Sequence, residues 1–159
     1  TETVICGTPA GVGEPWFDSV ESVISHAAFS LGGVKGVEFG AGFAAADMKG
    51  SECNDPLRVS DGRIVTTTNN NGGVNGGITN GMPIVFRCAV KPTPSIAQTQ
   101  DTVDFLKNEN TQLSIHGRHD PAIIRRICPV LDSVAALCVA DMLSLRYGTD
   151  VLTKGVDDR

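Results

Sequence analysis

The sequence is poor in aromatic residues and has no excess of basic charge. Only 5% of its 159 residues are aromatic, and 13 Lys and Arg stand against 18 Asp and Glu, which leaves a net charge of -5. A negative chain repels the phosphate backbone of nucleic acids, so no nucleic-acid partner is expected. The 41% of hydrophobic residues is enough for the core of one globular domain, or of part of one.

The sequence also lacks the cysteine and histidine spacings that bind metals. Its five cysteines form no Cys-x-x-Cys pair, their number is odd, and most lie in apolar runs, as reduced core thiols do. None stands beside a histidine that would activate it as a nucleophile. His26 and His116 have no partners at metal-ligand spacing. We therefore expect no metal site and a cytoplasmic location.

No hydrophobic run has the roughly 18 apolar residues needed to span a bilayer, so no membrane association is expected. The first residue is Thr1 rather than Met, and residues 3–6 already have the apolar character of a buried strand. We expect these 159 residues to be part of a larger protein, with a preceding portion that the sequence does not include.

Hydrophobic patterning predicts both helices and strands. Apolar residues at helical spacing predict a helix over residues 17–31, started by Glu14-Pro15 and ended by Gly32-Gly33. A second helical region is expected after residue 121, with Pro129 breaking or restarting it. The polar residues 97–111 are expected to form an exposed loop. Strands are expected at residues 3–6, 34–39, 64–68, 84–90 and 113–115.

The last helical segment decides the predicted fold class. Residues 130–145 contain only four polar residues, and three of these fall on one narrow stripe. A helix that is apolar nearly all round, and too short to cross a membrane, should be buried between two layers. No Gly-x-Gly-x-x-Gly motif follows the first strand. We therefore predict an α+β fold, a layered β/α/β sandwich with helices packed between sheets, rather than a doubly wound nucleotide-binding fold.

Two segments rich in glycine or proline are candidates for ligand binding. Residues 69–81 contain three Asn-Gly pairs, which either form a nest of N–H groups for an anion or a flavin edge, or form tight hairpin turns. Residues 91–95, Lys-Pro-Thr-Pro-Ser, place an ammonium group and two hydroxyls on a backbone stiffened by prolines at a strand end. This segment suits phosphate binding, or it is a surface turn.

A third candidate groups a cation, a titratable imidazole and a carboxylate at Arg118-His119-Asp120-Pro121. If these side chains converge on a pocket, they can bind an anion and transfer a proton. Alternatively, Asp120 is the N-cap of the following helix and Pro121 is its first residue. The two roles are compatible, and both stay open at this point.

Five motifs occur along the chain. They are Gly-Val-Gly-Glu-Pro at 11–15, Val-Lys-Gly-Val-Glu-Phe-Gly at 34–40, Ile-Thr-Asn-Gly at 78–81, Lys-Pro-Thr-Pro-Ser-Ile at 91–96 and Gly-Arg-His-Asp-Pro at 117–121. Taken together, in this order and spacing, they strongly resemble chorismate synthase. The resemblance covers nearly the whole sequence and corresponds to the C-terminal part of that enzyme.

The resemblance implies an FMN-dependent lyase that forms chorismate from 5-enolpyruvylshikimate 3-phosphate, by 1,4-elimination of phosphate and a ring proton. Reduced FMN would be required without net oxidation, and the enzyme would be a homotetramer. By motif, Lys91, Pro92, Thr93, Pro94 and Ser95 would hold FMN, Gly32, Gly33 and Gly76 would lie against it, Arg118 would lie at the flavin and substrate pocket, and Asp120 would exchange a proton near flavin N5.

The family's two catalytic histidines and its arginine-rich substrate loops have no match in this sequence, and His26, His116 and His119 are not candidates in their place. We therefore expect these residues to carry roughly half of an active site and to be inactive alone. The rival hypothesis is a non-catalytic anion-binding or assembly module, in which the glycine-rich and Lys-Pro segments form an anion site or subunit contacts.

Overall fold

A computed structural model describes residues 1–118, 120 and 122–155 of the chain. Its central element is a three-stranded antiparallel sheet in the order β1-β7-β2, formed by Glu2–Ile5, Ile84–Val90 and Val34–Phe39. These are three of the five predicted strands, and β2 and β7 begin and end at the predicted residues. The β-branched and aromatic residues of β7 suit a central strand because they pack well on a pleated surface.

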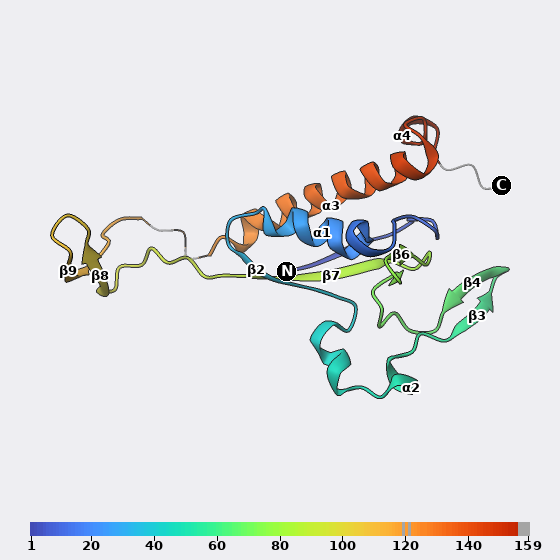
Figure 1. Cartoon of the computed structure of the whole chain (residues 1–159), viewed down its shortest axis with the longest axis horizontal. Coiled ribbons are helices and arrows are strands. Elements are labelled where there is room, and N and C mark those ends of the chain that lie inside the picture. The colour runs from blue at the N-terminus through green and yellow to red at the C-terminus, as the bar shows by residue number, and fades with distance from the viewer. Residues whose placement is uncertain (119, 121, 156–159) are drawn as a thin grey trace.

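Two helices, α1 (Val20–Phe29) and α3 (Ile124–Tyr147), cover one face of this sheet (Figure 1). Side chains alternate along β7, so that Ile84, Phe86 and Cys88 lie under the helices and are at most 4% exposed. The rest of the core comes mainly from Val20, Ile24 and Ala28 of α1 and from Ile127, Leu131, Ala135 and Met142 of α3.

The helix α1 begins later than the sequence predicts. Glu14-Pro15 lead into a 3-10 turn, η1 (Trp16–Asp18), and the α-helix is capped by Ser19, whose side-chain oxygen accepts a hydrogen bond from the N–H of Ser22 at 3.1 Å. Serine is a favourable N-cap because it satisfies a free N–H group of the first turn. The predicted start at Glu14-Pro15 is therefore wrong, whereas the predicted end before Gly32-Gly33 is confirmed.

The helix α3 is a single element of 24 residues, and Pro129 lies inside it. The predicted break at Pro129 is therefore wrong, and so is the prediction of a helix too short to span a bilayer. By length and composition alone α3 could cross a membrane, and 33% of its most apolar window is buried in the fold. Its inner face packs in the core, and Asp132 accepts a hydrogen bond from the Thr3 hydroxyl of β1 at 3.1 Å. In this fold the inner face of α3 is part of the core, and its outer face is open.

The remaining elements are small, and several project from this body (Figure 1). The predicted exposure of residues 97–111 is confirmed, but the predicted loop is wrong, because Gln100–Asp104 and Glu109–Leu113 pair as the hairpin β8–β9. The predicted strand at 64–68 is β4, which pairs with a strand that the pattern missed, β3. The other bounds are η2 (Gly42–Asp47), α2 (Gly50–Cys53), β3 (Leu57–Ser60), β4 (Arg63–Thr66), β5 (Val74–Asn75), β6 (Ile78–Thr79) and α4 (Val151–Lys154).

The mixed α+β class is confirmed by these elements. Within the described residues α1 and α3 lie on one face of one three-stranded sheet, and the outward side chains of α3 are open, with Leu137 at 71% and Leu145 at 78% exposure. Among these same residues no second sheet covers the outer face of the helices. The second layer of the β/α/β sandwich stays a prediction.

Candidate functional site

Several predicted site residues meet where β7 ends and β2 begins. Lys91 directly follows β7, and its N–H donates to the carbonyl oxygen of Gly33 at 2.8 Å. Gly33 has φ +100, and a Cβ there would lie 3.0 Å from Cδ1 of Ile123, the N-cap residue of α3. Only glycine adopts this conformation readily and leaves room for Ile123. The junction therefore brings Gly33, Lys91 and the start of α3 together.

Two side chains of the Lys-Pro-Thr-Pro-Ser segment, Lys91 and Thr93, are without a polar partner among the described residues. The hydroxyl oxygen of Thr93 is buried and has no hydrogen-bond partner among the described residues. Lys91 is exposed, and within the described part of the chain it forms no ion pair. Pro92 and Pro94 restrict the backbone around these groups. A buried polar atom without a partner costs free energy, so the Thr93 hydroxyl is suited to an acceptor or donor supplied by a ligand.

Arg118 and Asp120 lie on a second connecting segment that runs beside the first. The segment after β7 leads out to the hairpin β8–β9, and the segment after β9 returns to α3 (Figure 1). The Ser114 hydroxyl donates to the carbonyl of Ala97 at 3.2 Å and ties the two segments together. Arg118 and Asp120 are both exposed on the returning segment. The cation and the carboxylate thus belong to the same end of the molecule as Lys91.

Asp120 does not cap the helix that follows it. The N-cap of α3 is Ile123, and no side chain caps that end. One carboxylate oxygen of Asp120, Oδ2, instead lies 3.0 Å from a guanidinium nitrogen of Arg126. The capping hypothesis for Asp120 is therefore wrong, because the helix starts too far along the chain. His119 and Pro121 of the same motif lie outside the described residues.

Gly76 lies at the other end of α1 from this junction. It forms the turn of the hairpin β5–β6 with Gly77, and both glycines have positive φ, 59 and 90 respectively. A two-residue turn with positive φ at both positions favours Gly-Gly, so the hairpin hypothesis holds for this part of the cluster. The Gly76-Gly77 turn lies at the N-terminal end of α1, since a Cβ on Gly77 would be 2.8 Å from Cβ of the N-cap Ser19. Gly32 and Gly33 follow the C-terminal end of the same helix. The ten residues of α1 separate the two positions by about 15 Å.

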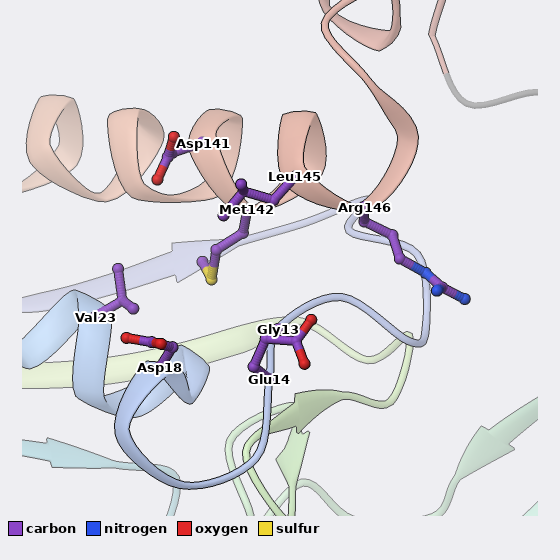
Figure 2. Close-up of a pocket in the computed structure, with 8 residues that line it drawn as sticks. All are labelled: Gly13, Glu14, Asp18, Val23, Asp141, Met142, Leu145 and Arg146. Atoms are coloured by element: carbon purple, nitrogen blue, oxygen red, sulfur yellow. The ribbon is translucent and has the colours of Figure 1, made fainter.

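A separate cavity of about 120 Å³ lies between the Gly13–Asp18 loop and the C-terminal half of α3 (Figure 2). Its floor includes Val23, Met142 and Leu145, and Figure 2 shows carboxylates of Glu14, Asp18 and Asp141 around it. Pockets for cofactor-sized ligands usually have roughly 300–1,000 Å³. This cavity is therefore too small for a flavin, although it borders the first motif of the sequence.

The described residues form no cluster of metal ligands, and two of the five cysteines have thiols with a raised pKa. Among the described residues no three His, Cys, Asp or Glu side chains converge as metal ligands. Burial raises the pKa of the Cys88 thiol, and burial followed by the charge of Asp141 raises that of Cys138. Both thiols therefore stay protonated near neutral pH. Cys6 and Cys128 are exposed, so the prediction that most cysteines are core residues is wrong.

Sequence reasoning missed Arg126 as a partner of Asp120. The sequence offered a weak signal, because Arg125 and Arg126 stand in the first turn of a helix, where cations are unfavourable unless an acidic group is near. The six-residue separation from Asp120 crosses the loop before α3, so helical spacing alone would not pair them.

Comparison with known proteins gives consistent matches over most of the chain. The family model described as chorismate synthase matches residues 1–144. A chorismate synthase of Methanosarcina barkeri is 52% identical over 147 residues, which cover 92% of this chain and 40% of that protein. One of Chitinophaga pinensis is 54% identical over 153 residues, which cover 96% of this chain and 46% of that protein. A crystal structure of chorismate synthase matches with a TM-score of 0.74 and 32% identity, over 94% of this chain and 38% of that one.

The chain thus spans less than half the length of these relatives. The family match nevertheless includes the sheet, the junction at Gly33 and Lys91, the returning segment with Asp120, and most of α3. Sequence identity and the fold agree over the same residues. This chain therefore belongs to the chorismate synthase family.

Proposed function

We propose that this chain supplies the flavin side of a chorismate synthase active site. The reaction is the shikimate-pathway step in which 5-enolpyruvylshikimate 3-phosphate loses phosphate and a ring proton to give chorismate, a precursor for aromatic amino acids. When bound, reduced FMN would supply electron density for the loss of phosphate without net oxidation. The protein's part is to bind, to exclude water and to handle the proton.

The residues at the end of β7 have the chemistry to hold FMN. The Lys91 ammonium and the hydroxyls of Thr93 and Ser95 are donors for phosphate oxygens, on a backbone restricted by Pro92 and Pro94. Gly33 and Gly32 lie beside them, and Arg118 adds a permanent cation for the anionic flavin and substrate. The Asp120 carboxylate would accept or give the proton that is exchanged with the bound flavin. The contribution of Gly76 is a prediction from the family motif alone, since it stands beyond the far end of α1.

The observation that carries this proposal is the Thr93 hydroxyl, which is buried with no hydrogen-bond partner among the residues that the structure describes, in the segment that the family motif assigns to FMN. Replacing Thr93 by Val keeps the shape and removes the hydroxyl. Because a hydrogen bond to a charged group contributes about 1.5–3 kcal/mol, FMN should bind roughly tenfold to a hundredfold more weakly.

The test is a fluorescence titration of FMN against the whole protein that carries these residues. Thr102→Val is the matched control, because Thr102 is exposed in the hairpin β8–β9. The proposal expects weaker binding for Thr93→Val and unchanged binding for Thr102→Val. Equal binding by the wild type and Thr93→Val would remove the support for an FMN site here.

We also propose that residues 1–159 do not turn over substrate by themselves. They span about 40% of the relatives, and no segment matches the family's catalytic histidine motifs. An intact mass of about 16.7 kDa, measured on the sample that is assayed, would establish that only these residues are present. With that mass, chorismate formation from substrate and reduced FMN at the rate of a full-length enzyme would contradict the proposal.

The same proposal includes a second sheet over the helices and the assembly of the whole protein as a homotetramer. The open outer face of α3 supports a second sheet over the helices, which would complete a β/α/β sandwich. A homotetramer is supported by apolar side chains on one face of the hairpin β3–β4, where Leu57, Val59 and Ile64 are each more than 70% exposed. The cytoplasmic location is proposed from the biosynthetic role of the relatives. Sedimentation of the whole protein tests the tetramer.

A further inference from the structure

The first turn of α3 is an unfavourable place for a cation. The N-terminus of a helix carries partial positive charge, yet this turn contains Arg125 and Arg126, no acidic residue and no side-chain cap. The helix dipole and capping therefore give no reason for an arginine at position 126. The compensating negative charge comes from outside the helix, at Asp120, whose Oδ2 lies 3.0 Å from Arg126.

The ion pair links an exposed loop to a fixed point of the fold. The N–H of Arg126 donates to the carbonyl of Ile123 at 2.9 Å, and Ile123 packs against Gly33 at the end of the sheet. Asp120 lies in the loop and has no other polar partner among the described residues, so Arg126 is the described contact that holds its side chain. One oxygen is engaged, and Oδ1 is left to accept or give a proton.

The pair contributes little to folding. The side chains are 78% exposed at Arg126 and 50% exposed at Asp120, and exposed ion pairs are screened by water and salt. A role in stability therefore does not explain it, whereas a role in orienting a reacting carboxylate does.

We infer that Arg126 is a positioning residue, which holds the Asp120 carboxylate by Oδ2 so that Oδ1 faces the proton it exchanges. This inference rests on the proposed function, because it needs Asp120 to take part in proton exchange. The Asp120 side chain is flanked along the chain by Arg118, Arg125 and Arg126, and of these only Arg126 is paired with it in the described structure. A neutral side chain of similar size at position 126 should keep the Asp120 carboxylate in the protein but remove the contact that orients it.

The experiment compares five variants of the whole protein loaded with reduced FMN: Arg126→Gln, Arg126→Lys, Arg125→Gln, Asp120→Asn and the double variant Asp120→Asn/Arg126→Gln. Arg126→Gln should lower kcat at least tenfold with little change in substrate KM or Tm, and Arg126→Lys should recover part of the loss. Arg125→Gln is the matched control and should behave as the wild type. The double variant should be no slower than Asp120→Asn alone, because the two residues act as one unit.

A second measurement does not depend on turnover. In the flavin-free protein, hydrogen exchange in a peptide spanning residues 118–126 should become faster in Arg126→Gln and stay unchanged in Arg125→Gln. If Asp120→Asn abolishes turnover while Arg126→Gln keeps the wild-type kcat, the inference is overturned and the proposed function stands. If Asp120→Asn keeps wild-type turnover, the proposed role of Asp120 and the inference both fail.

Discussion

The inner and outer faces of α3 should respond very differently to the same substitution. Leu131 lies on the inner face at 1% exposure, and Leu137 lies on the outer face at 71%. Leu131→Ala loses the transfer free energy of a buried side chain and leaves a cavity, which together cost about 2–5 kcal/mol. For a chain of this size the Tm should fall by roughly 5–15 °C. Leu137→Ala should change stability by less than about 0.5 kcal/mol.

The assay is thermal and urea unfolding of the 159-residue chain, followed by circular dichroism, with the wild type and both variants at one concentration. Equal losses of unfolding free energy for the two variants would refute our assignment of the buried face. The same pair in the whole protein then tests the sandwich proposal. There a second sheet over the helices would make Leu137→Ala costly too, by about the amount of a core substitution.

Two further substitutions, at Asp55 and Gly40, test contacts with the loop at residues 68–71. Although partial burial opposes its ionisation, Asp55 has its pKa lowered from 3.8 by hydrogen bonds from Thr68 and from the N–H groups of Asn71 and Asn70. The ionised carboxylate therefore stabilises the fold above pH 3.8, and this stabilisation is lost as the pH falls through the lower pKa of the folded state. Acid should destabilise the wild type more than Asp55→Asn. Parallel curves of unfolding free energy against pH would contradict this. Gly40→Ala should destabilise more than Gly62→Ala in urea unfolding, because both glycines have positive φ but only a Cβ on Gly40 would meet backbone, 2.0 Å from the Asn70 oxygen. Similar losses of unfolding free energy for both variants would show that the positive φ, and not the contact with the backbone, determines the cost of the substitution.

The elements that the sequence predicted well are those whose signal is local. The strands β2 and β7 were predicted at their observed bounds, and the end of α1 was marked by Gly32-Gly33. Apolar runs, helical spacing and glycine stops act within a few residues, so they can be recognised without the fold. The hairpin β8–β9 was missed because its strands are polar and exposed, and periodicity needs a buried face.

The family motifs identified the candidate residues, but only tertiary structure decided which of them lie together. Packing of Ile123 on Gly33 brings the start of α3 to Lys91, across residues far apart in the chain. The start of α3 at Ile124 leaves Asp120 paired with Arg126 rather than at the helix end, and the contact of Gly77 with Ser19 places the β5–β6 turn at the opposite end of α1. The sequence by itself determined composition, motifs and local elements, since these depend on neighbouring residues. Contacts between distant segments depend on how the helices pack on the sheet, and no local sequence pattern specifies that packing.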